Sequence, residues 1–271
     1  MTAIPRALPG RTGERAARRR WLDDALTLLL YALPFVAVGA FYPLVGRFSG
    51  WRPPHVADVR ALELRLFPVH VGTEVRGVSE VIAAHSSVVL DLLCGAAYFL
   101  FLPEVFGMAL YLFFRSRRRA LELSVGFLAV NLLGWAIWVL FPVAPPWYAD
   151  LHSAGAGQAL QAAANPAALE RVDTLLGMHY FARFYAKSQY VFGALPSLHA
   201  AYAVLVARVV WPLGGALRAI TLVFAGIIAF AAMYLRHHYL LDVLAGAALG
   251  FSVGTLVLAV PLGKRSEVVA S

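Results

Sequence analysis

Apolar residues form six long windows along this chain, separated by short stretches rich in arginine, proline or histidine. A helix needs about 20 mostly apolar residues to cross the hydrocarbon core of a bilayer, and the windows have about that length. They fall at about residues 25–45, 87–114, 121–141, 198–216, 219–235 and 239–260. The pattern predicts an all-α, polytopic membrane protein with a bundle of six transmembrane helices.

Two of the windows have features of their own. The first is longer than a signal-peptide core, although Ala37 to Ala40 offers small side chains suited to a peptidase. We expect a retained helix there, with a cleaved signal as the alternative. Pro103 and Glu104 interrupt the second window, where we expect a kink or a carboxylate that faces the bundle.

The composition agrees with a membrane setting. Of the 271 residues, 61% are apolar and 14% are charged, and the mean hydropathy is +0.71; soluble domains carry about 25% charged residues. The single cysteine, Cys94, excludes an internal disulfide and a multi-cysteine zinc site. The chain also lacks the HExxH, P-loop and GxSxG motifs of zincins, NTPases and many serine hydrolases. We expect no metal, cofactor or nucleic acid.

The polar stretches divide the chain into three parts. Residues 1–20 carry six arginines without a sustained apolar run and are expected to form a disordered basic tail. Residues 21–263 form the membrane catalytic domain, and residues 264–271 form a second tail. Within the membrane domain, residues 46–86 and 142–197 are long connections.

The two connections differ in pattern. In the second, Asn165 suits a helix N-cap, Pro166 the first helical position and Gly177 the end, which predicts a short helix from Pro166 to Leu176. In the first, His55 to Val71 mixes apolar and charged residues without a clear period. We expect that stretch to lie at the membrane interface.

The net charge of +8 indicates the orientation, because cytoplasmic loops carry an excess of lysine and arginine. If the six helices alternate, most basic residues fall on one side, which predicts cytoplasmic termini and extracytoplasmic long connections. That side would hold Arg6, Arg11, Arg15, Arg18, Arg19, Arg20, Arg115, Arg117, Arg118, Arg119, Arg218, Lys264 and Arg265. The ratio of 21 arginines to 2 lysines is associated with a GC-rich, bacterial coding source.

The first candidate for chemistry precedes the sixth window. His238 and Asp242 are four residues apart, so on a helix they share a face and the carboxylate can orient the imidazole. An imidazole held in this way suits a nucleophile or a general base. His237 lacks such support, because its counterpart is Leu241. The same spacing is also typical of a structural polar pair at a helix end.

The second candidate opens the fourth window. Ser197 suits an N-cap after Pro196, so the unpaired N–H groups of the first turn can bind phosphate. His199 stands in that turn, where it can act as an acid. The alternative is a purely structural role, in which Pro196 and Ser197 only begin the helix and His199 lies at the membrane interface.

Cations and aromatic residues on the same side of the membrane complete the predicted site. Arg183, Lys187 and Arg236 are candidates for binding the phosphate, although each also suits the lipid head-group boundary. Trp147 and Tyr148 are weaker candidates for positioning the substrate, since aromatic belts populate both membrane interfaces. Two histidines, an anion site and nearby cations together favour in-line phosphoryl transfer.

Three motifs in this arrangement resemble a known family. PSLHA at 196–200, HHYLLD at 237–242 and PPWY at 145–148 are similar to signatures of the type 2 phosphatidic acid phosphatase superfamily. The closest resemblance is to the branch that contains fungal inositol phosphorylceramide synthase, which has PSLH where the phosphatases have PSGH. The resemblance implies a six-helix membrane fold and a metal-independent enzyme.

The resemblance also implies roles for matching residues. His238 would be the nucleophile that forms a phosphohistidine, Asp242 its orienting partner and His199 the acid, with Ser197 at the phosphate site. Two features of the phosphatases are missing: their first signature, a lysine and an Arg-Pro pair on one helix, and an arginine at the position of Ala232. We therefore expect the phosphate cations to come from elsewhere.

The sequence thus predicts an integral membrane lipid phosphotransferase or phosphatase whose active site faces the extracytoplasmic side. A lipid or sugar hydroxyl would be the acceptor for transfer, which we favour, and water for hydrolysis. The alternative is a proton-coupled transporter or flippase of an anionic lipid, for which Asp91 and Glu104 would suit a relay. We expect structural roles for these two carboxylates. Histidines at helix starts on one side favour the enzyme over a transporter with a midplane site.

Overall fold

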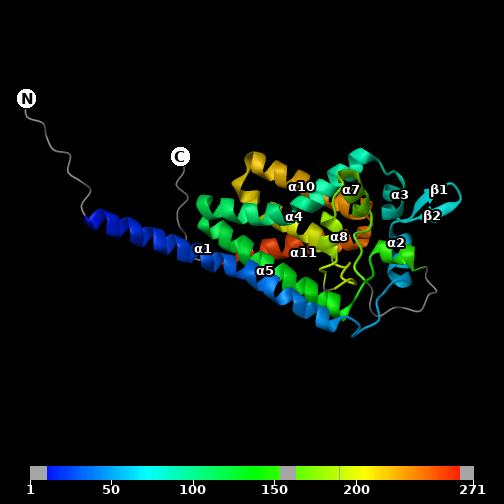
Figure 1. Ribbon diagram of the computed structural model, residues 1–271, viewed down its shortest axis with the longest axis horizontal. Coiled ribbons are helices and arrows are strands. Elements are labelled where there is room, and N and C mark those ends of the chain that lie inside the picture. Colours follow the sequence, from blue (N-terminus) through cyan, green and yellow to red (C-terminus); the bar gives the residue numbers. More distant parts are fainter. Residues whose placement is uncertain (1–10, 153–162, 189, 263–271) are drawn as a thin grey trace, which may run out of the picture.

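The computed structural model describes residues 11–152, 163–188 and 190–262. Long helices lie side by side along the molecule, and the short elements gather at one end (Figure 1). The long helices are α1 (Arg11–Val45), α4 (Val88–Arg115), α5 (Arg117–Leu140), α10 (Gly215–Tyr234) and α11 (Leu240–Ala259). A shorter helix, α9 (Leu198–Val210), packs against α4, α5, α10 and α11 and so forms the centre of the bundle.

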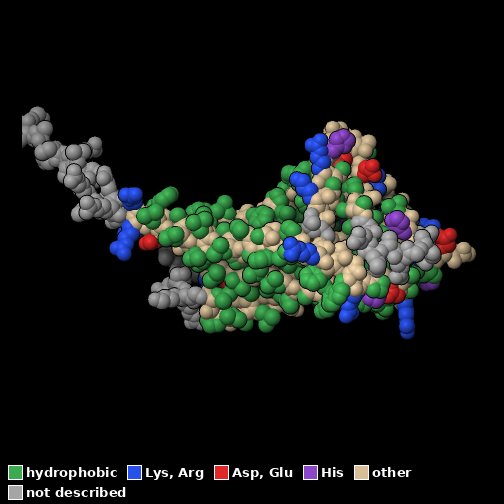
Figure 2. All heavy atoms as spheres, turned by 60° about the horizontal axis from the view of Figure 1, so that its bottom comes forward, with side chains coloured by type: hydrophobic (Ala, Val, Ile, Leu, Met, Phe, Trp, Pro, Cys, Tyr) green, Lys and Arg blue, Asp and Glu red, His purple; other side chains and the backbone are tan. Residues whose placement is uncertain are grey.

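The all-α bundle confirms the predicted fold class, with one difference in the helix count. Among the described residues, five helices are long and apolar enough to cross a membrane, but α9 has only 13 residues. A single 3₁₀ turn, η2 (Trp211–Leu213), follows α9, and then Gly214 and Gly215 adopt positive φ angles of 69° and 57°. These glycines end the helix before residue 216, because an α-helix requires negative φ. Hydrophobic side chains cover the long middle of the molecule (Figure 2).

The amino-terminal segment differs from the prediction. α1 begins at Arg11, so residues 11–20 are helical rather than disordered. Arginine, alanine and glutamate are good helix formers, and they extend the helix outward from its apolar part. Figure 1 shows α1 running past the end of the other helices. Arg6, Lys264 and Arg265 of the predicted tails lie outside the described residues.

Pro103 does not interrupt α4, which continues from Val88 to Arg115. The expectation of a buried carboxylate is met instead, because both carboxylate oxygens of Glu104 are buried. Within the described residues, neither oxygen has a hydrogen-bond partner.

The two long connections form the short elements at one end of the bundle. The first contains the 3₁₀ turn η1 (Gly46–Phe48), α2 (Ala57–Leu66), the antiparallel hairpin of β1 (Val69–Val71) and β2 (Glu74–Arg76), and α3 (Val78–Ala84). The second contains α6 (Pro146–Leu151), α7 (Leu169–Leu176) and α8 (Tyr180–Tyr185). The interfacial stretch expected at His55 to Val71 is therefore largely a helix.

The predicted short helix after Asn165 is present but begins later. The Asn165 side-chain oxygen accepts a hydrogen bond from the Ala167 N–H at 2.6 Å, and Ala167 has a positive φ of 52°. This turn cannot be helical, so α7 begins at Leu169. Gly177 ends the helix in the left-handed conformation, as predicted.

Contact between α9 and α11 is unusually close. A methyl group built on Gly246 would lie 2.1 Å from the Ser197 carbonyl oxygen, and one on Gly250 would lie 2.2 Å from the Ala201 carbonyl oxygen. The Ser197 N–H also donates to the Asp242 carbonyl at 3.0 Å. Glycines on α11 therefore let the two helix backbones touch, as small residues do at many membrane helix interfaces.

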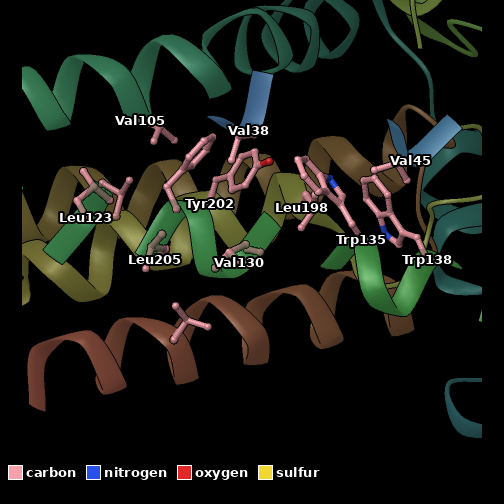
Figure 3. Packing of buried hydrophobic residues seen from close by; sticks show 14 of the residues in the cluster. Val38, Val45, Val105, Leu123, Val130, Trp135, Trp138, Leu198, Tyr202 and Leu205 are labelled. Atoms are coloured by element: carbon pink, nitrogen blue, oxygen red, sulfur yellow. The ribbon is translucent and has the colours of Figure 1, made fainter. Parts of the chain in front are cut away.

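Side chains from α1, α4, α5 and α9 fill the core along this bundle (Figure 3). Phe127 of α5 packs against Tyr202 of α9, with ring centroids 4.9 Å apart. The packing is tight at Gly126 and Gly134 of α5, where an added methyl group would meet the side chains of Leu205 and Leu198 at 2.9 and 2.7 Å. The core therefore fixes how α5 and α9 lie against each other.

The α9–α11 contact can be tested with matched glycine substitutions. Gly250→Ala forces a methyl group against the Ala201 carbonyl, and overpacking of this kind costs about 1–3 kcal/mol. Gly226→Ala places the same group on α10 in open space and serves as the control. In detergent, we expect Gly250→Ala to unfold at a lower temperature than the parent and Gly226→Ala to unfold no lower. Equal unfolding temperatures for the two variants would contradict the close packing.

Candidate active site

A cavity of about 480 Å³ opens between the helices beneath the outer elements. Its walls are mostly apolar and aromatic, and they include His199, His237 and His238. The aromatic side chains come from six helices and from the segment before α9: Phe35, Tyr42, Phe101, Phe106, Phe127, Trp135, Trp138, Trp147, Phe184, Tyr185, Tyr190 and Tyr202. Such a cavity suits a ligand with long apolar parts and one small polar centre.

His238 is a buried side chain in the loop between α10 and α11. Its Nδ1 lies 2.9 Å from the carbonyl oxygen of Ala194. A carbonyl only accepts hydrogen bonds, so Nδ1 carries the hydrogen, and Nε2 of the neutral ring has a free lone pair. That lone pair is directed toward His199, whose Nδ1 lies 3.2 Å away. The geometry leaves His238 with one anchored nitrogen and one available for chemistry.

His199 lies in the first turn of α9, as predicted. Its ring stacks on Tyr98, with centroids 4.5 Å apart and planes 22° apart, and also contacts Phe101 at 4.6 Å. Both aromatic partners come from α4. These contacts hold the ring beside His238, and so the structure brings together the two histidines that the sequence singled out.

Asp242 lies close to His238, but His238 makes its shortest hydrogen bond with another group. The carboxylate oxygen Oδ2 is 3.8 Å from His238 Nδ1 and accepts the Tyr239 N–H at 2.8 Å. His238 precedes α11, so helical spacing does not align it fully with Asp242. The Ala194 carbonyl, which sequence spacing could not reveal, takes the hydrogen bond instead. The Asp242 carboxylate thus mainly accepts the N–H group at the start of α11. Its interaction with His238 is electrostatic, over a short distance.

Ser197 is fully buried and caps α9. Its hydroxyl oxygen accepts the Ala200 N–H at 3.4 Å, so the predicted N-cap is confirmed. Among the described residues, the N–H groups of Leu198 and His199 have no hydrogen-bond partner. Both residues line the cavity. The start of α9 therefore has two amide donors without a partner in the described part of the chain, both in residues that line the histidine cavity.

The three predicted cations lie in different places. Lys187 lines the histidine cavity and also a neighbouring cavity of about 360 Å³ beside α8, whereas Arg183 lines the neighbouring cavity and not the histidine cavity. Arg236 donates to Asp150 at 2.6 and 2.9 Å and to the Ser79 hydroxyl at 2.9 Å. It lines a third cavity, so the structure does not bring it to the histidine pair.

The two aromatic candidates also separate. Trp147 is buried and lines both the histidine cavity and the neighbouring cavity that contains Arg236. Tyr148 packs instead against His152, with centroids 4.4 Å apart, and against Phe192 at 5.2 Å. Trp147 is therefore the one of this pair that borders the candidate site.

Asp91 belongs to an ion-pair network, in agreement with the structural role expected for it. Its carboxylate accepts hydrogen bonds from Arg171 of α7 at 2.6 to 3.1 Å and from the Tyr234 hydroxyl at 2.8 Å. These hydrogen bonds join α4, α7 and α10, because Tyr234 is the last residue of α10. This network holds the outer helix α7 over the bundle.

The sequence did not indicate the role of His237. Its Nε2 donates to the Pro166 carbonyl at 3.2 Å, and its ring stacks between Tyr185 and Tyr98 at 4.7 and 5.5 Å. Burial, reinforced by the neighbouring His238, lowers the pKa of His237 to about 3. The neutral ring thus ties the second long connection to the site.

This neutral ring has a consequence for stability in acid. Between about pH 6.5 and pH 3, His237 binds a proton in the unfolded chain but stays neutral in the folded protein. The free energy of unfolding therefore falls as the pH falls through that window. We expect His237→Gln to unfold with a weaker pH dependence there than the parent, while the exposed His85→Gln behaves as the parent does. Thermal unfolding at several pH values measures this. An unchanged slope for His237→Gln would contradict the assignment.

Comparisons with known proteins identify the family of this chain. Residues 63–256 match the family model described as the PAP2 superfamily. A phosphoinositol dihydroceramide synthase of Bacteroides thetaiotaomicron is 35% identical over 228 residues, which cover 81% of this chain and 73% of that protein. An inositol phosphorylceramide synthase of Candida albicans is 32% identical over 180 residues, or 65% of this chain and 37% of that protein.

A second fungal relative and one solved structure complete the comparison. The inositol phosphorylceramide synthase catalytic subunit of Saccharomyces cerevisiae is 33% identical over 129 residues, and this chain covers 31% of its length. The crystal structure of Aquifex aeolicus LpxE aligns with a TM-score of 0.49 and 18% identity, over 67% of this chain and 92% of that one. The family match covers well over half of the chain and includes both histidines, and the chain therefore belongs to the PAP2 superfamily.

Proposed function

We propose that this membrane enzyme transfers the phosphorylated head group of a phospholipid to the hydroxyl group of a second lipid, through a phosphohistidine on His238. The observation that carries the proposal is the 3.2 Å approach of His238 Nε2 and His199 Nδ1 inside an apolar cavity. The names of the relatives favour phosphoinositol as the head group and a ceramide-like alcohol as the acceptor.

The proposed first step is an in-line displacement at phosphorus. The lone pair of His238 Nε2 attacks, the bond from phosphorus to the leaving lipid oxygen breaks, and protonated His199 gives that oxygen its proton. In the second step the acceptor hydroxyl attacks the phosphohistidine while neutral His199 takes its proton, and His238 leaves. The two rings are in contact, so the phosphoryl group enters by replacing their hydrogen bond.

The start of α9 would stabilise the negative charge on the phosphoryl oxygens. The N–H groups of Leu198 and His199 lie at a helix N-terminus, which attracts anions. Lys187 lines the same cavity and is our candidate for the accompanying cation. Arg236 is committed to Asp150, and Arg183 lies beside another cavity, so we assign neither to the phosphoryl group.

The cavity walls favour a lipid alcohol over water as the acceptor. Aromatic and aliphatic side chains surround the histidine pair, and they would bury the chains of a lipid while limiting the access of water. This arrangement supports transfer rather than hydrolysis.

The two histidine roles can be separated with lipid donors that differ in the leaving group. We expect His238→Ala to lose activity by at least about 10³-fold with every donor, because removal of a nucleophile leaves little catalysis. His199→Ala should lose activity with a natural alkoxide leaving group but keep much of the first step with a p-nitrophenyl phosphodiester lipid, whose leaving group needs no proton. The control is His85→Ala. Undiminished turnover by His238→Ala would contradict the proposal.

We also propose that both termini face the cytoplasm and that the histidine cavity opens toward the extracytoplasmic side. Supporting this, the arginine-rich end of α1 and the α4–α5 turn lie at the opposite end of the bundle from the hairpin (Figure 1).

This orientation predicts a labelling pattern in intact cells. In a Cys94→Ala background, Glu74→Cys on the exposed hairpin should react with an impermeant thiol reagent from outside. Arg115→Cys, at the exposed end of α4, should react only after permeabilisation. The reverse pattern would contradict the orientation.

A further inference from the structure

Glu63 is a buried carboxylate far from the motifs in sequence but in contact with the helix that follows His238. It lies on α2 and has 1% of its surface exposed. Its two oxygens each accept one backbone hydrogen bond, from the N–H of Leu240 and from that of Leu241, both at 3.0 Å. A side chain of the first long connection thus holds the first turn of α11.

The local sequence of α11 cannot supply this cap. The residue at the N-cap is Tyr239, which makes no side-chain hydrogen bond to the helix start. Tyrosine is not among the side chains that cap from this position, which are serine, threonine, aspartate and asparagine. Asp242 accepts the Tyr239 N–H, and Glu63 accepts the next two. Three successive amides after His238 are therefore held by two carboxylates.

α2 also packs against the segment that binds His238 Nδ1. Val59, one turn before Glu63, is buried in a small cluster with Val143, Ala194 and Tyr239. Ala194 provides the carbonyl that fixes His238 Nδ1. α2 thus packs against both segments that determine where the His238 ring lies.

α2 is itself anchored to its surroundings. Arg60 pairs with Glu80 of α3 at 2.9 Å, and the Ala144 N–H donates to the His55 carbonyl at 2.9 Å. Residues 142–144 in turn pair with residues 192–194 through the Val143 and Ala194 N–H groups. The Glu63 carboxylate is therefore presented to α11 by a supported element rather than by a free loop.

We infer that Glu63 is a positioning residue for the reaction, because its bidentate cap on α11 sets where the His238 Nε2 lone pair points. The inference rests on the proposed role of His238 as nucleophile. Without the carboxylate, the Leu240 and Leu241 amides lose their acceptors. The first turn of α11 would then shift toward other acceptors, and the adjoining backbone of His238 would shift with it.

The test compares Glu63→Gln with Glu74→Gln, the same substitution at an exposed position on the hairpin. Glutamine keeps the size of the side chain but replaces one acceptor oxygen with an NH2 group, so one of the two amides faces a donor instead of an acceptor. The full-length enzymes are assayed with a p-nitrophenyl phosphodiester lipid. Because its leaving group needs no proton from His199, the assay reports the attack by His238.

We expect Glu63→Gln to lower kcat by about 10- to 100-fold, the scale of a small misplacement of a reacting group, with little change in KM. Glu63→Asp, whose shorter side chain reaches only one amide, should fall between the parent and Glu63→Gln. Glu74→Gln should match the parent. Thermal unfolding of each variant is measured in parallel, and kcat is compared at temperatures where all variants are folded.

Two results would overturn the inference. One is a parental kcat in Glu63→Gln, and the other is a loss of kcat that merely follows the unfolded fraction as the temperature rises. His238→Ala, assayed beside these variants, distinguishes the two proposals. Activity retained by His238→Ala overturns the proposed function, whereas an inactive His238→Ala beside a fully active Glu63→Gln overturns only the role of Glu63.

Discussion

Backbone contact between α9 and α11 determines where both histidines lie. Gly246 and Gly250 let α11 approach α9 until its backbone meets the carbonyls of Ser197 and Ala201, and the Ser197 N–H bonds to the Asp242 carbonyl. His199 stands in the first turn of α9, and His238 directly precedes α11. Any side chain between the two helices would move these rings apart, so the site depends on this contact.

Contacts from other segments of the chain then fix the orientation of the two rings. The Ala194 carbonyl sets the tautomer of His238, and Tyr98 of α4 stacks on His199. Glu63 holds the start of α11. Asp91 of α4 is paired with Arg171, because an isolated charge at such a depth is costly. The polar groups near the apolar cavity therefore serve mainly to hold its histidines in place.

Local patterns predicted the parts of the structure that depend on neighbouring residues. Apolar windows gave the long helices, Ser197 gave the start of α9, and the motifs identified the histidines that meet in the structure. Contacts between distant segments were beyond such reasoning. The bonds from Leu240 and Leu241 to Glu63 span 177 and 178 residues, and no periodicity in α2 points to them.

The same limit explains why the sequence could not identify which cation lies near the histidines. Charge and loop position singled out Arg236, but its partner Asp150 lies 86 residues away. A pairing of that kind can be seen only after folding. Lys187 was named on the same grounds as Arg236, and it is the one that lines the histidine cavity. Sequence alone had no means to separate the two.

The central claim is that the head group passes through a covalent bond to His238, and the stereochemical course at phosphorus tests it most directly. A donor lipid with a phosphorothioate diester of one configuration is converted by the enzyme, and the configuration of the product diester is determined. Each in-line displacement inverts phosphorus, so two successive displacements through a phosphohistidine predict net retention. Net inversion would mean a single direct transfer between the two lipids and would contradict the account.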